Sequence, residues 1–240
     1  MYQEDKYMRK IIIDTMAPIL WVLTIFDAVS IFRMFRAYKR HKVSEISLLT
    51  GILCLGLFYD SLMLSLGAVL PFGSVLKFLS QFRYILHCVL IPLLFPICGH
   101  ALKASKKTMK IIWIISIVIM VIGLYAGISV VTEERTVGRI RRYAESERTN
   151  KFADTVIQML DIVPVFFMMG IGIYLWIKKK NPNMFLSGFF MFLFTMLGIF
   201  LGKDPGGDKT QSLMFYISMY GESLMVYFLY RFIRKEEQNR

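Results

Sequence analysis

Six ionisable residues lie inside long apolar stretches of the sequence, where a charge is costly. They are Asp27, Asp60, Arg83, His87, Asp161 and Glu222. A charged side chain at the centre of a bilayer costs at least ~2.5–3.5 kcal/mol even on the most lenient scale. Such side chains must meet one another or water, so we expect them to gather in one polar pocket.

The balance of charge in this set indicates proton or cation handling. Four carboxylates face one arginine and one histidine. In a low dielectric, either some of the carboxyl groups are held neutral or a cation occupies the site. We expect Asp60 and Glu222 to change charge and His87 to relay a proton or contact a ligand. Arg83 would contact an anion or act as the internal counter-ion.

The neighbours of these residues fit a pocket that reaches from mid-membrane toward the outer face. Arg83 and His87 are four residues apart, so they share one face of a helix. Tyr84 and Tyr59 can add hydroxyl groups nearby. Gly221, beside the acid of the last apolar stretch, permits close approach of another backbone or a local kink.

Seven apolar stretches, each close to the ~20 residues that cross a bilayer, must position these side chains. Hydrophobic residues make up 56% of the 240, more than a soluble domain of this size can hide in one core. The sequence therefore predicts an all-α polytopic membrane protein, a seven-transmembrane-helix bundle that forms a single domain over residues 1–240. The stretches are 13–35, 46–70, 75–102, 111–132, 155–177, 184–201 and 212–233.

Basic residues cluster after the first, third and fifth stretches and in the C-terminal tail. By the positive-inside rule, this pattern predicts a multi-pass protein of the cell membrane with its N-terminus outside and its C-terminus in the cytoplasm. The long connection 132–154 carries six basic residues, which alone would favour the cytoplasm, but the other loops and the tail outweigh it. Arg139, Arg142 and Tyr143 have helical spacing, so we expect a surface helix or a cap over the outer mouth.

Several classes of site are excluded by composition. Only three histidines are present, and His41 and His100 fall at the cytoplasmic side, so a three-histidine zinc site cannot be built. The last stretch has no lysine at mid-depth for a retinal Schiff base, and phosphate-binding glycine motifs are absent. The positive charge sits at the ends of spans, which is a topological signal rather than a nucleic-acid surface. We expect no metal, no cofactor and no nucleic-acid partner, with the lipid bilayer as the surrounding partner.

Three short patterns resemble those of uncharacterised bacterial seven-span integral membrane proteins. They are Tyr59-Asp60-Ser61-Leu62 followed by Gly67, Arg83 with His87 followed by Pro92, and Gly221-Glu222, and they correspond to YDxL, RxxxH and GE. The resemblance covers the second, third and seventh stretches. It implies no known activity. The three patterns contain Asp60, Arg83, His87 and Glu222, which the cost of charge in a membrane also singles out.

These observations favour a transporter, channel or receptor-like protein that binds a small polar ligand, a proton or a cation. The runner-up is an intramembrane enzyme acting on a lipid, with His87 and Asp60 as acid and base. A third possibility is a structural or assembly protein without a ligand. Asp27 and Asp161 also fit a structural role as polar links between helices.

Overall fold

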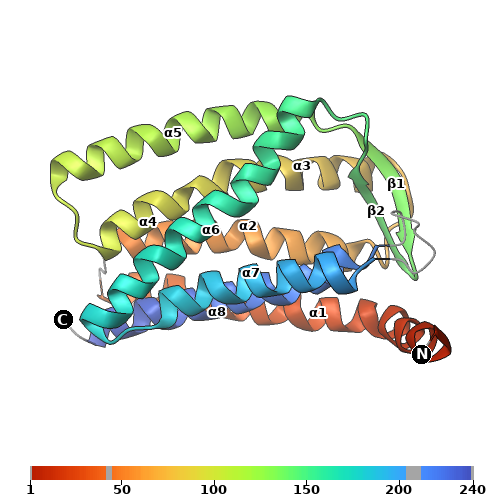
Figure 1. Ribbon diagram of the computed structural model, residues 1–240, viewed down its shortest axis with the longest axis horizontal. Helices are drawn as coiled ribbons and strands as arrows, with labels where there is room; N and C mark the ends of the chain where they lie inside the picture. The colour runs from red at the N-terminus through yellow and green to blue at the C-terminus, as the bar shows by residue number, and fades with distance from the viewer. Residues whose placement is uncertain (1, 42–44, 204–211, 239–240) are drawn as a thin grey trace.

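A computed structural model describes residues 2–41, 45–203 and 212–238 and consists mostly of long helices that lie side by side (Figure 1). The helices are α1 (Tyr2–His41), α2 (Glu45–Leu66), α3 (Ser74–Leu90), α4 (Leu94–Ala101), α5 (Lys106–Ser129), α6 (Lys151–Lys179), α7 (Asn183–Leu201) and α8 (Met214–Gln238). A short 3₁₀ helix, η1 (Ile91–Leu93), joins α3 to α4, and two strands, β1 (Thr132–Val137) and β2 (Ile140–Glu145), form a hairpin. The prediction of an α-helical bundle is confirmed, with the hairpin as an addition.

Within the described residues, six helical segments are long and apolar enough to cross a membrane. They correspond to the first six predicted stretches, and the third of them runs through α3, η1 and α4. The seventh predicted stretch is also a helix, α8, but it falls outside this group. Its neighbours are α7, α1 and α2, so much of its surface faces protein.

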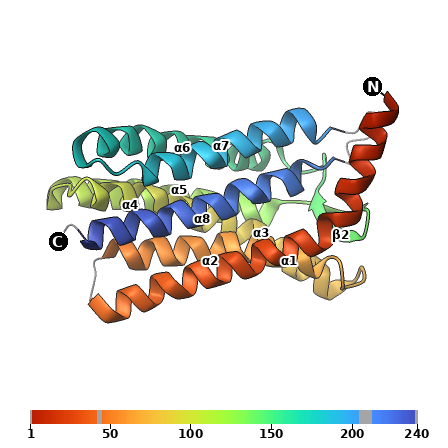
Figure 2. The ribbon, with the colours of Figure 1, turned by 90° about the horizontal axis from the view of Figure 1, so that it is seen from below.

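The first helix is longer than the sequence predicted. The first predicted stretch ends at residue 35, which leaves Arg36 and the residues after it in a loop, whereas α1 continues to His41. That prediction was wrong because arginine and lysine are good helix formers and no glycine or proline interrupts the segment. At its other end, α1 bends near the N-terminus (Figure 2), and Pro18 lies within the helix.

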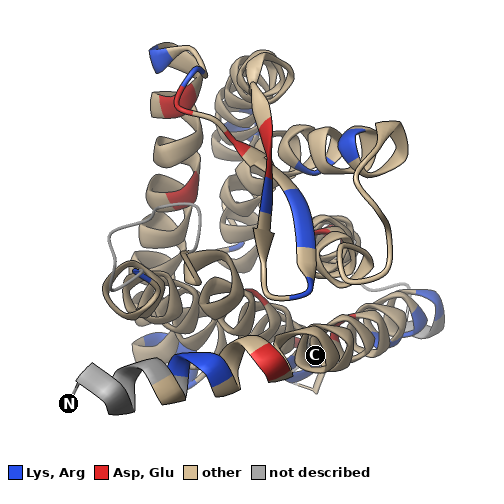
Figure 3. Cartoon of the chain, turned by 90° about the vertical axis from the view of Figure 1, so that its right-hand side faces the viewer, with Lys and Arg blue, Asp and Glu red and all other residues tan. Residues whose placement is uncertain are grey.

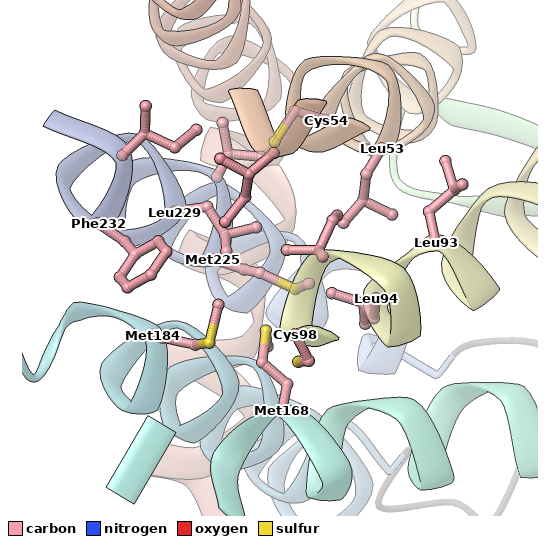
Figure 4. Close-up of a cluster of buried hydrophobic side chains, with 14 of the residues drawn as sticks. Leu53, Cys54, Leu93, Leu94, Cys98, Met168, Met184, Met225, Leu229 and Phe232 are labelled. Atoms are coloured by element: carbon pink, nitrogen blue, oxygen red, sulfur yellow. The ribbon is translucent and has the colours of Figure 1, made fainter. Parts of the chain in front are cut away.

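The apolar interior falls into two main clusters that occupy different levels of the bundle. One lies toward the end with the α6–α7 connection and includes Met34, Cys98, Met168, Met184 and Phe232. Figure 4 shows side chains from α4, α6, α7 and α8 pointing toward one another in this inner core. The other cluster lies at the hairpin end and joins α1, α2, α8 and the hairpin.

The segment predicted to form a surface helix or a cap is a β-hairpin that lies across one end of the bundle (Figure 3). The helix alternative was wrong, whereas the position of the hairpin fits a cap. Val137 pairs with Ile140, which leaves a two-residue turn whose first residue, Gly138, has a φ of 58°. Glycine at this position is typical of hairpin turns. The helical spacing of Arg139, Arg142 and Tyr143 was too short a pattern to indicate a helix. The backbone N–H of Arg141 donates to the carbonyl of Gly67, which docks the hairpin on the end of α2.

Candidate functional site

A histidine bridged between two carboxylates forms the centre of the site. Nδ1 of His87 lies 3.0 Å from Oδ2 of Asp60, and Nε2 lies 2.9 Å from Oδ1 of Asp161. The three residues come from α3, α2 and α6, so three helices meet at one imidazole ring. Asp60 is 1% exposed, whereas the Asp161 side chain is 45% exposed, and the chain of contacts therefore runs from the protein interior toward a more open surface.

Asp60 also pairs with Arg83, whose Nε lies 3.2 Å from Oδ1 of the carboxylate. Arg83 and His87 share one face of α3, as their spacing predicted, and together they contact both oxygens of Asp60. The contact of Arg83 with Oδ1 is an ion pair rather than a hydrogen bond, because that oxygen has no hydrogen-bond partner among the described residues.

These side chains lie beside a cavity of about 660 Å³ at the hairpin end of the bundle. Its walls come from α3, α6, α7, α8 and the hairpin. Of the residues singled out from the sequence, Arg83, Tyr84, His87, Asp161 and Glu222 line it, and Asp60 lies directly behind Arg83 and His87. The sequence therefore identified a set of residues that the fold brings together.

Glu222 is a carboxylate of the cavity wall with a buried oxygen that is unpartnered among the described residues, and Glu145 on the hairpin is another. Glu222 is 5% exposed, and its buried Oε2 has no hydrogen-bond partner within the described ranges 2–41, 45–203 and 212–238. Its position on α8 places it within electrostatic reach of Asp60, Arg83 and His87. Gly221 lets α8 approach α7 closely, because a Cβ there would lie 2.9 Å from Cβ of Phe194. The predicted close approach at this glycine is confirmed.

The polar site separates the two apolar clusters. Along α2, Leu57 belongs to the inner core and Leu64 to the hairpin-end cluster, with Asp60 between them. Along α8, Met225 and Met219 flank Glu222 in the same way. The inner core thus closes the cavity on the side away from the hairpin.

Besides Asp60, two of the predicted site residues do not line the cavity. Asp27 is fully buried between α1, α2 and α8, and its Oδ2 accepts hydrogen bonds from Ser61 at 3.2 Å and Ser223 at 3.0 Å. These serines follow Asp60 and Glu222 in the sequence, so Asp27 supports the site from behind. Tyr59 points elsewhere and donates its hydroxyl to the carbonyl of Leu79.

The hairpin contributes charged cavity residues that sequence analysis did not select: Arg135, Arg142 and Glu145. Burial lowers the pKa of Arg142 to about 10, and repulsion from Arg83 and Arg135 acts in the same direction. Burial also raises the pKa of Glu145, and the nearby Asp154 adds to this effect. The cavity lining carries both signs of charge, since Arg135 and Arg142 lie there with Glu145 and Asp161. Figure 3 shows both basic and acidic positions on the hairpin. A hairpin predicted at the Gly138-Arg139 pair would have been the signal for selecting these residues as site candidates.

Metal-ligating side chains do not gather within the part of the chain that the structure describes: it contains no group of three or more His, Cys, Asp or Glu residues arranged to hold a metal ion. What the site does present is a set of hydrogen-bonded, titratable groups beside a cavity. No protein-family model matches the chain, and no curated protein is similar enough to count as a relative. The resemblance to bacterial seven-span proteins stays a prediction.

Proposed function

We propose that this chain is a seven-span protein of the cell membrane whose cavity opens to the outside and binds a small polar ligand together with a proton or cation, as transporters, channels or receptor-like proteins do. The N-terminus lies outside and the C-terminus in the cytoplasm in this arrangement, because the basic loops and tail follow the positive-inside rule. The seventh span is α8. Its polar residues fit a helix that packs against other helices rather than lipid.

The hydrogen-bonded chain of Asp60, His87 and Asp161 carries this proposal. A neutral imidazole has one donor nitrogen and one acceptor nitrogen, whereas an ionised carboxylate only accepts. Two ring nitrogens at hydrogen-bond distance from two carboxylates therefore require one additional proton, on the ring or on a carboxyl group. A group that holds such a proton beside a cavity is suited to couple proton uptake to ligand binding.

Glu222 supports the same function. A buried carboxylate without a hydrogen-bond partner for one oxygen is unfavourable, so a structural role alone gives no reason for it. Protonation, or a cation bound in the cavity, would remove the cost. This argues against the third possibility, an assembly protein without a ligand.

An intramembrane enzyme acting on a lipid is the second candidate, and the arrangement of α6 and α7 favours it. The two helices touch near the inner core, where a Cβ at Gly188 would lie 2.6 Å from Cγ of Met169. Toward the hairpin end they diverge, and the cavity lies where they separate, between Asp161 and Thr195 (Figure 1). A lipid could enter there from the side, with His87 and Asp60 as acid and base.

A ligand screen with matched variants tests the leading function. Purified protein in detergent is heated with amines, amino acids, carboxylates and monovalent cations between about pH 5 and pH 8, the range in which histidine titrates. We expect a compound that raises the melting temperature of the wild type to lose its effect, or its pH dependence, in Glu222→Gln.

Glu134→Gln is the control, because it makes the same change on the hairpin outside the cavity lining. If every stabilising compound acts equally on the wild type, Glu222→Gln and His87→Gln, the cavity is not the binding site. Release of a chemically altered lipid by the wild type, but not by His87→Gln, would instead favour the enzyme.

A further inference from the structure

Arg142 is a half-buried cation on the cavity wall that has no carboxylate partner among residues 2–41, 45–203 and 212–238. Its guanidinium lies 3.9 Å from the centre of the Phe215 ring, and its Nε is buried without a hydrogen-bond partner in the described part of the chain. Besides Tyr84, the groups that act on its charge are two further arginines, Arg83 and Arg135. Three guanidinium groups near one another repel, and a guanidinium whose Nε is buried without a partner is costly, so an anion is the partner that this environment favours.

The other two arginines already have carboxylate partners. Arg83 pairs with Asp60, and Nη2 of Arg135 lies 2.6 Å from Oε1 of Glu133. Arg142 has no ion pair of this kind among the described residues. Its stacking on an aromatic ring uses the face of the guanidinium and leaves the in-plane N–H donors for a planar, two-point contact with a carboxylate or phosphate.

Other donors line the same part of the cavity. Lys203 contributes a second cation. Ser218 lies one helical turn from Phe215 on α8 and lines the cavity, but its hydroxyl donates to the carbonyl of Phe215. The hydroxyl of Tyr84 accepts from the backbone N–H of Glu145, so its own hydrogen can point into the cavity. Lys203 and Tyr84 therefore add donors beside the guanidinium of Arg142.

We propose that the cavity binds its ligand through an anionic group, a carboxylate or a phosphate, held by Arg142. This inference rests on the proposed function and names the chemistry of its ligand. Phe215, Ser218 and Glu222 lie on one face of α8, and seven residues of helix separate the first from the last by about 10 Å. The anionic group binds at the hairpin end, and the rest of the ligand extends toward Glu222 and His87.

A cysteine placed in the cavity reports whether the cavity favours anionic or cationic thiol reagents, so this site can be tested without knowledge of the natural ligand. Ser218→Cys is treated in full-length protein with sulfonatoethyl or trimethylammonium-ethyl methanethiosulfonate, and each rate is divided by that of the same reagent with glutathione. We expect the anionic reagent to be preferred, and the preference to fall about tenfold or more when Arg142→Gln is added. Arg139→Gln, at the exposed hairpin tip, should leave it unchanged.

Protection of the same cysteine distinguishes the sources of the anion. Slower labelling in the presence of inorganic phosphate indicates a soluble anion, whereas slower labelling in phosphatidylglycerol nanodiscs than in phosphatidylcholine nanodiscs indicates a lipid headgroup. Protection by neither, or a charge preference that Arg142→Gln does not alter, would overturn the proposal. A neutral methanethiosulfonate checks that the cavity of each variant remains accessible, and Arg142→Lys should retain the preference for the anionic reagent.

The two proposals fail separately. A ligand that depends on Glu222 but is indifferent to Arg142 leaves the proposed function in place and rejects the anion site. Anion binding at Arg142 without any effect of Glu222→Gln or His87→Gln rejects the coupling to a proton.

Discussion

At the scale of single residues, Asp60 holds the polar site together. Its two oxygens contact Arg83 and His87, and both of those residues belong to α3. Asp161 on α6 reaches the same imidazole ring from the other side. One carboxylate therefore links α2 to α3, and through His87 to α6, at the level where the apolar interior is interrupted.

Removal of Arg83 should destabilise the protein, because Asp60 would keep only its contact with His87 in a buried position. We expect Arg83→Ala to lower the stability by about 3 kcal/mol, the range for breaking a buried ion pair, and to lower the melting temperature in detergent. The double variant Arg83→Ala/Asp60→Asn should recover part of this loss, because it removes the stranded charge. An unchanged melting temperature for Arg83→Ala would contradict the role assigned to this pair.

The convergence of the charged residues was predictable, but their individual orientations were not. The cost of charge in lipid is a property of the sequence, and it correctly grouped Arg83, His87 and Glu222 on one cavity. Whether a side chain reaches that cavity depends on the rotation of its helix about its own axis. Asp27 and Tyr59 face neighbouring helices instead, and no local pattern in their stretches distinguishes the two cases.

At the scale of elements, the hairpin forms one wall of the cavity and depends on close contact with α2. A Cβ at Gly67 would collide with the carbonyl oxygen of Arg141, so only glycine permits this docking. Gly67 belongs to the YDxL pattern with its following glycine, and the contact supplies a physical reason for a glycine at that position. The sequence predicted the helices because each is long and apolar, but the hairpin has neither property and was missed.

Gly67→Ala should therefore loosen the hairpin without unfolding the bundle. We expect the backbone amide of Arg141, which donates to the Gly67 carbonyl at 2.9 Å, to exchange its hydrogen at least about tenfold faster in this variant. Gly170→Ala is the matched control, since a Cβ at that exposed position meets nothing within 4 Å. Equal exchange at Arg141 in both variants would show that the hairpin does not depend on this contact.

At the scale of the whole molecule, the proposed topology puts the hairpin and the α6–α7 connection on opposite sides of the membrane. Arg139 at the hairpin tip and Lys178 near the end of α6 are both exposed, and the three native cysteines are buried. In intact cells, a membrane-impermeant maleimide should label Arg139→Cys, and it should label Lys178→Cys only after lysis. The reverse pattern would invert the topology and turn the cavity toward the cytoplasm.

Access to the cavity from outside tests the central claim most directly, and α7 offers a matched pair of positions for it. Thr195 lines the cavity, while Ser187 lies eight residues, or about 12 Å, deeper in the helix, is fully buried and donates to the carbonyl of Met225. The measurement is the rate at which an impermeant thiol reagent modifies each cysteine variant in intact cells. The account predicts rapid modification of Thr195→Cys and none of Ser187→Cys. Failure of Thr195→Cys to react from outside, or reaction of both positions alike, would contradict an outward-opening cavity closed by the inner core.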